Sequence, residues 1–414
     1  MKIHILTIGD ELLIGQVIDT NSARMAQFLL EIGAQVTGKT TVGDNLDDML
    51  DALDSATRKA DAVLITGGLG PTKDDITKKA LAKFYGTGFV FHQDTLERLN
   101  RILEKLNRPM TDALRDQCFV PLNATVLTNK MGSAPGMWFE ENGKVVVSMP
   151  GVPFEMEYLM QYEVLPRLQR RFNNLPTAHR TLLTAGEGES MIAEYLKDFE
   201  DSLPGYVKLA YLPAIGRVRL RLTVSDADEG FVKKTLEEKF REMEGLLPPE
   251  LIVGYDEDTL ESAIGETLRK HGLTLSTAES CTGGYLAHLI TSVSGSSDYF
   301  LGSIVSYANE VKMKQLGVGE DTLKNHGAVS EETVREMVAG AIRLLKTDIA
   351  IATSGIAGPT GGTPEKPVGT IWLAVGNKDR IETKKLQLGK DRLRNIQYTA
   401  IQGLNLLRLF LRAD

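Results

Sequence analysis

The segment LTLSTAESCTGGYLAHLI, residues 273–290, passes from an apolar strand through a short polar loop into an amphipathic helix. From about Thr259 onward, strand-like and helix-like stretches continue to alternate. These stretches are SIVSYANE (303–310), SEETVREMVAGAIRLLK (330–346), DIAIATSGIAG (348–358), VGTIWLAVG (368–376), ETKKLQLG (382–389) and RLRNIQYTAIQGLNLLRLFL (392–411). Such alternation is typical of a sheet covered by helices, so the sequence predicts an α/β domain over residues 259–414.

A second α/β domain is predicted for residues 1–172, because the same alternation occurs there. Its first stretches are KIHILTIG (2–9), NSARMAQFLLEIG (21–33), AQVTGKTTVG (34–43), LDDMLDALDSATRKA (46–60) and DAVLITGGLG (61–70). Between the two domains, residues 178–254 combine two helical stretches with a pair of strands at 207–225, which predicts a small α+β module. The segment PPELIVGYDEDTLES, residues 248–262, holds prolines, a glycine and an acidic run, and it is interpreted as a linker.

The composition narrows the class of protein. Over 414 residues the formal net charge is −8, which disfavours non-specific nucleic-acid binding, because such binding needs a basic face. Cys118 and Cys281 lie far apart and in no zinc-ligand spacing, so neither a disulfide framework nor a zinc site is expected. The apolar run at the start meets Asp10 too early for a signal peptide, and we expect a cytoplasmic protein without a membrane segment.

The loop after residues 273–279 carries a candidate nucleophile. Ser280 lies between an apolar strand and a helix whose start is marked by Gly283 and Gly284. Amides at a helix start, here those of residues 282–284 including Thr282, can stabilise an anion or an oxyanion, and glycines allow a ligand to approach closely. The alternative is that Ser280 only caps the helix, since serine is a common N-cap and no GxSxG motif is present.

Two later segments supply candidate partners for this serine. In SIVSYANEVKMKQLG, Tyr307 and Lys312 follow a strand. No histidine is suitably placed as a base, so a desolvated Lys312 with a lowered pKa, assisted by the Tyr307 hydroxyl, is the candidate base. Alternatively, Lys312 is a solvated surface lysine.

A glycine-rich loop, ATSGIAGPTGGTPEKPVGT, follows another buried strand. It places Thr353, Ser354 and Gly355 where they can bind a phosphate or a ribose, and Arg392 can supply positive charge for a phosphate. The loop can equally be a plain connection between strands.

The motifs AESCTGG (278–284), GSIVSYANEVK (302–312), HGAVS (326–330) and SGIAGPTGGTPEKPVGT (354–370) together closely resemble the C-terminal domain of the CinA family. The resemblance implies a deamidase that hydrolyses the carboxamide of nicotinamide mononucleotide to nicotinate mononucleotide and ammonia. It assigns Ser280 as nucleophile, Lys312 as general base, Tyr307 as its partner, and Ser354 with an arginine near Arg392 as substrate ligands. No cofactor is expected for this reaction.

Three tracts mark a candidate site in the first domain, namely IGDELLIGQVIDTNS (8–22), ITGGLGPTKDD (65–75) and MPGVPFEM (149–156). Paired Asp74 and Asp75 beside glycines suit a hard cation that bridges a pyrophosphate, and these two aspartates are the candidate metal ligands. They can instead simply open the following helix. The candidate residues of this site are Glu11, Asp44, Gly67, Gly68, Gly70, Asp74 and Asp75.

The resemblance extends to the rest of the chain. The first domain is similar to the molybdopterin-binding fold, which implies a metal-dependent ADP-ribose pyrophosphatase with a divalent cation, and a monovalent cation as a further candidate. The middle module resembles a KH-type domain but lacks the GxxG clamp of RNA-binding versions, so it is interpreted as a spacer or dimerisation element. We expect small nucleotide substrates, no nucleic-acid partner and a homodimer. The alternative hypothesis is a pterin-binding or competence-related scaffold without turnover.

Overall fold

The computed structural model describes residues 1–70, 75–172 and 175–412. Its contacts divide the chain into two units, one of residues 1–178 with 225–232, and one of residues 179–224 with those from 233 onward. None of the helices in the described part of the chain combines the length and apolar character that a membrane crossing requires.

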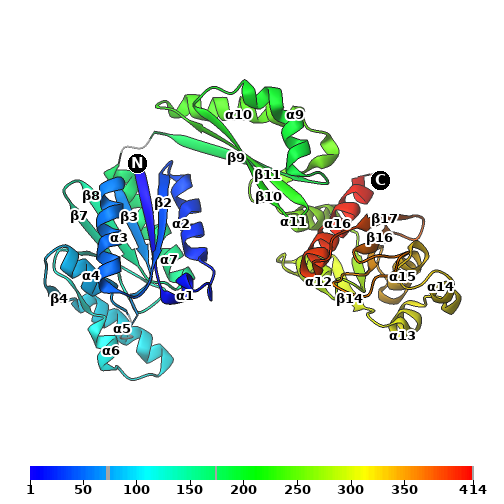
Figure 1. Cartoon of the computed structure of the whole chain (residues 1–414), viewed down its shortest axis with the longest axis horizontal. Helices are drawn as coiled ribbons and strands as arrows, with labels where there is room; N and C mark the ends of the chain where they lie inside the picture. The colour runs from blue at the N-terminus through cyan, green and yellow to red at the C-terminus, as the bar shows by residue number, and fades with distance from the viewer. Residues whose placement is uncertain (71–74, 173–174, 413–414) are drawn as a thin grey trace. The chain divides into compact units, whose positions relative to one another are not determined.

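The first unit is built on a six-stranded sheet in the order β2-β1-β3-β8-β7-β6. Neighbours among β1, β2, β3 and β8 pair in parallel, whereas β7 runs antiparallel to both β8 and β6. These strands are β1 (Lys2–Ile8), β2 (Gln35–Val42), β3 (Ala62–Thr66), β6 (Thr125–Leu127), β7 (Gly136–Glu141) and β8 (Lys144–Met149). Figure 1 shows α2 and α3 alongside this sheet.

Helices cover both faces of that sheet, because its strands carry apolar side chains on both sides. One face packs on α2 (Thr20–Glu31), α7 (Pro153–Leu159), the π-helical turn η1 (Met160–Val164) and α8 (Leu165–Arg171). The other face packs on α3 (Leu46–Lys59) and α4 (Thr77–Phe84). The predicted α/β class is therefore confirmed for this unit.

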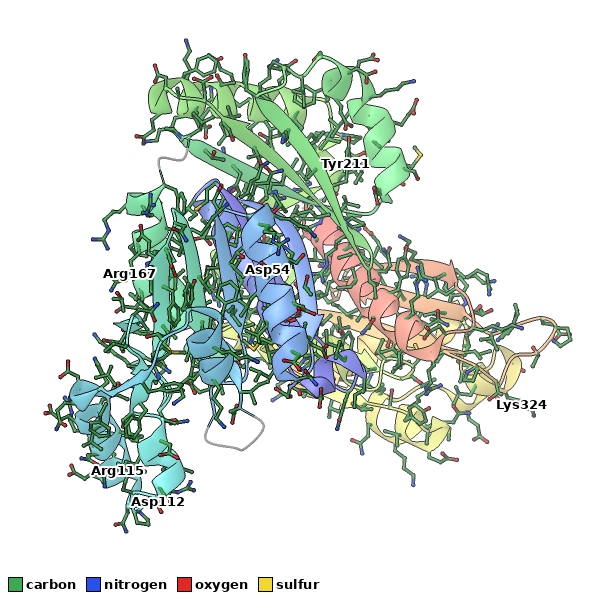
Figure 2. All side chains as sticks on the ribbon, turned by 60° about the vertical axis from the view of Figure 1, so that its left-hand side comes forward. Asp54, Asp112, Arg115, Arg167, Tyr211 and Lys324 are labelled. Atoms are coloured by element: carbon green, nitrogen blue, oxygen red, sulfur yellow. The ribbon has the colours of Figure 1, made fainter. Side chains whose placement is uncertain are left out.

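A smaller group of elements is inserted after α4. It comprises β4 (Phe89–Phe91), α5 (Gln93–Leu106), α6 (Asp112–Asp116) and β5 (Phe119–Pro121), with β4 and β5 paired antiparallel. Leu99, Leu103 and Cys118 form its own small core. In Figure 2 the side chains of Asp112 and Arg115 project from α6 at the end of this insertion. A short helix, α1 (Asp10–Leu13), directly follows β1.

The middle module is a four-stranded sheet in the order β10-β11-β9-β12. Burial alternates strictly along β11, which predicts that only one face of the sheet is covered. Two helices, α9 and α10, lie along that sheet (Figure 1). The elements are β9 (Thr177–Ala185), α9 (Glu189–Asp201), β10 (Val207–Ala214), β11 (Arg217–Ser225), α10 (Glu229–Gly245), η2 (Pro249–Leu251) and β12 (Ile252–Tyr255).

The interpretation of residues 248–262 as a linker is wrong for its central part. Residues 252–255 form β12, which pairs antiparallel with β9 at the edge of the middle sheet. The buried Glu261 of the next helix also pairs with Arg217 of β11 at 3.2 Å. The β-branched residues of ELIVGY favour a strand at the edge of the sheet. This tertiary pairing outweighs the preference of the flanking prolines and acidic residues for a loop.

The last domain is a five-stranded sheet in the order β14-β13-β15-β16-β17, with the first three strands parallel and the others antiparallel. Helices α11, α12 and α16 cover one face and α15 the other. The strands are β13 (Leu275–Glu279), β14 (Phe300–Val305), β15 (Ile349–Gly355), β16 (Thr370–Gly376) and β17 (Ile381–Gln387). The helices and helical turns are α11 (Leu260–His271), α12 (Tyr285–Thr291), η3 (Ser296–Asp298), α13 (Asn309–Val311), the π-helical η4 (Lys312–Leu316), α14 (Glu320–Asn325), α15 (Glu331–Leu345) and α16 (Arg392–Arg412). Parallel β13, β14 and β15 end on the same edge, where their loops meet.

Candidate active site

The turn between β13 and α12 holds Ser280 in a fixed position. Its amide donates to the carbonyl of Thr353 at the end of β15, 2.9 Å away, and its side chain is almost fully buried. Gly283 and Gly284 complete the turn with φ angles of 61° and 99°, which side chains other than glycine rarely adopt. The turn therefore places the serine hydroxyl at the carboxyl edge of the sheet.

Ser280 does not cap α12. The cap comes from the preceding residue, Glu279, whose carboxylate accepts hydrogen bonds from the amides of Gly284, Leu286 and Ala287 at 2.9, 3.1 and 2.8 Å. Because the carboxylate satisfies these amides, the hydroxyl of Ser280 is left for another partner.

That partner is Lys312, the first residue of η4. Its side chain is only 1% exposed, and its Nζ lies 3.0 Å from the Oγ of Ser280. The carbonyl oxygens of Ser306 and Tyr307 lie 2.7 and 3.4 Å from the same nitrogen. Burial lowers the pKa of Lys312, and no carboxylate of the described residues pairs with it. The interpretation of Lys312 as a solvated surface lysine is therefore wrong. Because its pKa is lowered, the lysine loses its proton at a pH nearer to neutrality than an exposed lysine does.

A cavity of about 250 Å³ opens in front of this pair. Six of the residues predicted from sequence line it, namely Ser280, Tyr307, Lys312, Ser354, Gly355 and Arg392. The other lining residues are Cys281, Asn309, Ala328, Val329, Ile356, Ala357, Gly358 and Thr360. Segments separated by more than a hundred residues thus converge on one hollow of a size suited to a small molecule.

Four other predicted residues do not line the cavity. Thr282 and Thr353 are buried behind its wall, where their hydroxyls are 2.7 Å apart. The amide of Gly283 donates to the carbonyl of Ser280, and the amide of Gly284 donates to Glu279. The expectation that the amides of both glycines face a bound anion is not met, since both amides already have acceptors inside the protein.

Tyr307 and Arg392 stand at the rim of the cavity. An Nη of Arg392 donates to the hydroxyl oxygen of Tyr307 at 3.0 Å, and its other Nη donates to the carbonyl of Gly358 at 2.8 Å. The hydroxyl of Tyr307 therefore pairs with the arginine, and only its carbonyl approaches Lys312. Since a guanidinium has five N–H donors, Arg392 keeps donors for a ligand in the cavity.

The glycine-rich loop is held by Asn395, which no motif in the sequence marked, and by the predicted residue Ser354. Asn395, buried in α16, donates to the carbonyls of Ala357 and Gly389 at 2.9 and 2.8 Å. Ser354 donates to the carbonyl of Ala328 at 2.6 Å, so its oxygen can only accept a hydrogen bond from a ligand. These contacts fix the far wall of the cavity.

In the first unit, the loops after β1 and β2 bring two acidic residues together. The amide of Asp10 donates to the carboxylate of Asp44 at 3.2 Å, and the amide of Asp44 donates to the carboxylate of Asp10 at 3.1 Å. Burial raises the pKa of Asp44, and the carboxylates of Asp10, Glu11 and Asp75 add to this effect. Asp10 was not selected from the sequence, although it lies in the same tract as Glu11.

The loop after β3 reaches the same edge of the sheet. Gly67 and Gly68 have φ angles of 109° and 64°, and the amide of Gly70 donates to the carboxylate of Asp75 at 2.7 Å. Asp74 lies outside the described residues. Within the described ranges, no three His, Cys, Asp or Glu side chains are grouped closely enough to hold a metal ion.

Known proteins match nearly the whole length of the chain. Residues 4–170 match the probable molybdopterin binding domain, residues 179–248 the damage-inducible protein CinA KH domain, and residues 257–411 the CinA C-terminal domain. A CinA-like protein of Cytophaga hutchinsonii is 44% identical over 98% of this chain and 96% of its own length. The chain belongs to the CinA family.

The chain is also similar to other CinA proteins. A CinA-like protein of Flavobacterium psychrophilum is 42% identical over 98% of both chains. The crystal structure of a competence/damage inducible protein from Agrobacterium tumefaciens is 37% identical, covers 37% of this chain and 93% of its own, and has a TM-score of 0.36. The predicted three-part architecture, with a molybdopterin-binding-like, a KH-type and a CinA C-terminal domain, is confirmed.

Proposed function

We propose that the C-terminal domain of this CinA-family chain hydrolyses the carboxamide of nicotinamide mononucleotide to nicotinate mononucleotide and ammonia. The observation that carries this proposal is the buried pair of Ser280 and Lys312, with Nζ 3.0 Å from Oγ at the floor of a cavity. A hydroxyl becomes a competent nucleophile when an adjacent base takes its proton, and a neutral buried lysine is such a base. The choice of substrate rests on the family resemblance.

The reaction balances with these two side chains and water. The Oγ of Ser280 attacks the amide carbonyl carbon while the Nζ of Lys312 accepts the hydroxyl proton. The tetrahedral adduct collapses, the C–N bond breaks, and Lys312 returns the proton to the leaving nitrogen, which departs as ammonia. Water, deprotonated by Lys312, then hydrolyses the ester on Ser280 and releases nicotinate mononucleotide.

The rim of the cavity supplies a ligand for the phosphate of the nucleotide. Arg392 lines the same cavity as Ser280 and Lys312, and its hydrogen-bond partners among the described residues are neutral oxygens, those of Gly358 and Tyr307. No carboxylate in the described part of the domain forms an ion pair with it, which favours a bound phosphate. We propose that the phosphate binds Arg392 while the carboxamide reaches Ser280.

Replacing Arg392 by methionine tests this orientation. The KM for nicotinamide mononucleotide should rise by about 10- to 100-fold, as expected when a charge-assisted hydrogen bond of roughly 1.5–3 kcal/mol is lost. Hydrolysis of nicotinamide riboside, which lacks the phosphate, should change little. The matched control is Arg394→Met, since Arg394 is exposed on the same helix and does not line the cavity. An equal loss on both substrates would show that Arg392 does not bind the phosphate.

The experiment for the deamidase itself follows both products by chromatography after incubation with nicotinamide mononucleotide, with and without a chelator. We expect ammonia and nicotinate mononucleotide in equal amounts under both conditions. Release of nicotinamide and ribose phosphate would mean that the glycosidic bond is cleaved instead. No product of either kind would favour the alternative of a ligand-binding scaffold.

We further propose that the N-terminal domain hydrolyses the pyrophosphate of ADP-ribose with a divalent cation. The supporting observation is the set of acidic residues at the carboxyl edge of its sheet, with Asp10 and Asp44 joined by reciprocal hydrogen bonds. Divalent cations commonly take one or two carboxylates and complete their coordination with substrate phosphates and water, so a complete protein ligand set is not required. The residues present thus fit a cation that binds together with its substrate.

Replacing Asp44 by asparagine should abolish metal-dependent release of AMP and ribose phosphate from ADP-ribose. Removing this carboxylate weakens the cation site by one charged ligand, while the Asp10 amide can still donate to the asparagine oxygen. Ammonia release from nicotinamide mononucleotide serves as the internal control and should stay unchanged. ADP-ribose hydrolysis that persists in the variant, or in chelator, would contradict the proposal.

A further inference from the structure

Glu279 is the most completely buried acidic residue at the deamidase site, and the reaction proposed above does not use it. Its side chain is 0% exposed, and no arginine or lysine among the described residues pairs with it. An unpaired buried carboxylate destabilises the fold unless hydrogen bonds replace its hydration shell. Burial of this carboxylate therefore destabilises the fold unless other interactions compensate for the lost hydration.

The offset comes from donors on two neighbouring elements. The amides of Gly284, Leu286 and Ala287 point at the two carboxylate oxygens from the start of α12. The hydroxyl of Ser303, on β14, approaches Oε1 at 3.3 Å, and Thr277 donates to Ser303 at 2.7 Å. A carboxylate has about four acceptor positions, so this set of donors comes close to saturating it.

The main chain of Glu279 connects the same residue to the lysine. Its carbonyl accepts the amide of Ser306 at 2.8 Å, and the carbonyl of Ser306 in turn accepts Nζ of Lys312 at 2.7 Å. The next residue along the chain is Ser280. The side chain of Glu279 is thus hydrogen-bonded to the start of α12, which follows the turn that carries Ser280. Its main-chain carbonyl is hydrogen-bonded to Ser306, whose own carbonyl holds Lys312.

We propose that Glu279 is a positioning residue that sets the distance between Ser280 and Lys312, an inference that rests on the proposed hydrolase function of this pair. Glu279 caps α12 from the end of β13, so the turn of residues 280–284 is clamped at both ends. A capping serine at position 280 could accept from an amide of the helix start, but the cap would engage the nucleophilic hydroxyl. Placing the cap on Glu279 leaves that hydroxyl to the lysine.

Glutamine is the informative replacement, because it keeps the shape of the side chain and loses its charge. One of its two terminal groups is an NH₂ donor. That group cannot accept the backbone hydrogen bonds that the corresponding carboxylate oxygen of Glu279 accepts. The turn should shift while the cavity wall of residues 354–358 and Arg392, which is held by separate contacts, stays in place. Catalysis should therefore suffer more than substrate binding.

The test uses the full chain and two measurements on Glu279→Gln. The first is the rate at which a fluorophosphonate probe labels Ser280 as a function of pH, and the second is kcat and KM with nicotinamide mononucleotide. We expect the labelling rate and kcat to fall about 100-fold, the loss typical of a misplacement near 1 Å, with KM within about threefold of the wild-type value. The pH midpoint of labelling should not move, since Lys312 keeps its burial. The matched control, Glu261→Gln, makes the same change at another buried carboxylate of the domain, one that pairs with Arg217 and does not line the cavity, and it should stay within about threefold.

Labelling of Glu279→Gln at the wild-type rate, or a rise in KM as large as the fall in kcat, would overturn the proposal. If thermal unfolding shows that Glu279→Gln does not fold, Glu279→Asp replaces it, because aspartate keeps the charge but is one methylene too short to reach all three amides. A folded Glu279→Asp that labels at the wild-type rate would equally overturn the proposal. Labelling requires no nucleotide, so it tests the role of Glu279 independently of the substrate. A wild-type protein that is labelled on Ser280 but releases no ammonia would contradict the proposed substrate and leave the labelling test of Glu279 valid.

Discussion

Replacing Ser280 by alanine should lower kcat/KM for ammonia release from nicotinamide mononucleotide by at least about 10⁴-fold, as removal of a nucleophile does in other serine hydrolases. The change removes a single oxygen. The amide of residue 280 can still donate to the carbonyl of Thr353, and the cap on α12 belongs to Glu279. We therefore expect an unchanged fold, with thermal unfolding close to that of the wild-type protein.

The control for this result is Cys281→Ala. Cys281 also lines the cavity and is the only other residue of the turn with a nucleophilic atom at the cavity wall. Burial raises the pKa of its thiol to about 12, so it is almost entirely protonated near neutral pH and is a poor nucleophile. Ammonia release by Cys281→Ala should stay within about threefold of the wild-type rate. The opposite pattern, with activity kept in Ser280→Ala and lost in Cys281→Ala, would assign the nucleophile to the thiol.

Replacing Lys312 by methionine should reduce kcat by about 10²- to 10⁴-fold, the usual contribution of a general base. Methionine matches the buried stem of the lysine but cannot accept a proton. Because the carbonyls of Ser306 and Tyr307 lose their donor, some loss of stability is expected as well. Activity is therefore compared per folded molecule, with the folded fraction measured by circular dichroism.

The pH dependence of the rate distinguishes a lysine that acts as a general base from a lysine with only a structural role. Burial lowers the pKa of Lys312 below its ordinary value of 10.5, so the folded chain binds this proton more weakly than the unfolded chain does. Wild-type kcat/KM should rise with pH as the folded lysine loses its proton, with a midpoint below 10.5. Stability linked to this group should also rise with pH between the lowered pKa and 10.5, because only the unfolded chain is protonated there. A residual activity in Lys312→Met with the same rising limb would show that another group is the base.

The layered fold followed from the sequence because its signal is local. In 273–290 and 348–358, apolar runs of strand length end at glycines, and the structure places strands at both. The strand at 252–255 was missed because it depends on pairing with β9, nearly seventy residues earlier in the chain. Such a contact leaves no mark on the periodicity of a short segment flanked by prolines.

The candidate site was predicted unevenly for a related reason. That Ser280 and Lys312 are involved came from motifs, but their contact depends on η4, whose π-helical start carries the lysine side chain into the interior. The alternative that Ser280 caps α12 arose because serine commonly fills that position, whereas a carboxylate arriving from the strand provides the cap. Asn395, which holds the glycine-rich loop, lies on a long helix whose pattern shows only a face toward the core.

The central claim is that the amide is cleaved through an ester on Ser280, and interception by hydroxylamine tests it most directly. Hydroxylamine attacks such an ester faster than water does, so the wild-type protein should convert part of the nicotinamide mononucleotide to the corresponding hydroxamate. The hydroxamate should increase with hydroxylamine concentration at the expense of nicotinate mononucleotide, and Ser280→Ala should form neither product. Nicotinate mononucleotide as the sole product at every hydroxylamine concentration, with ammonia still released, would contradict the account.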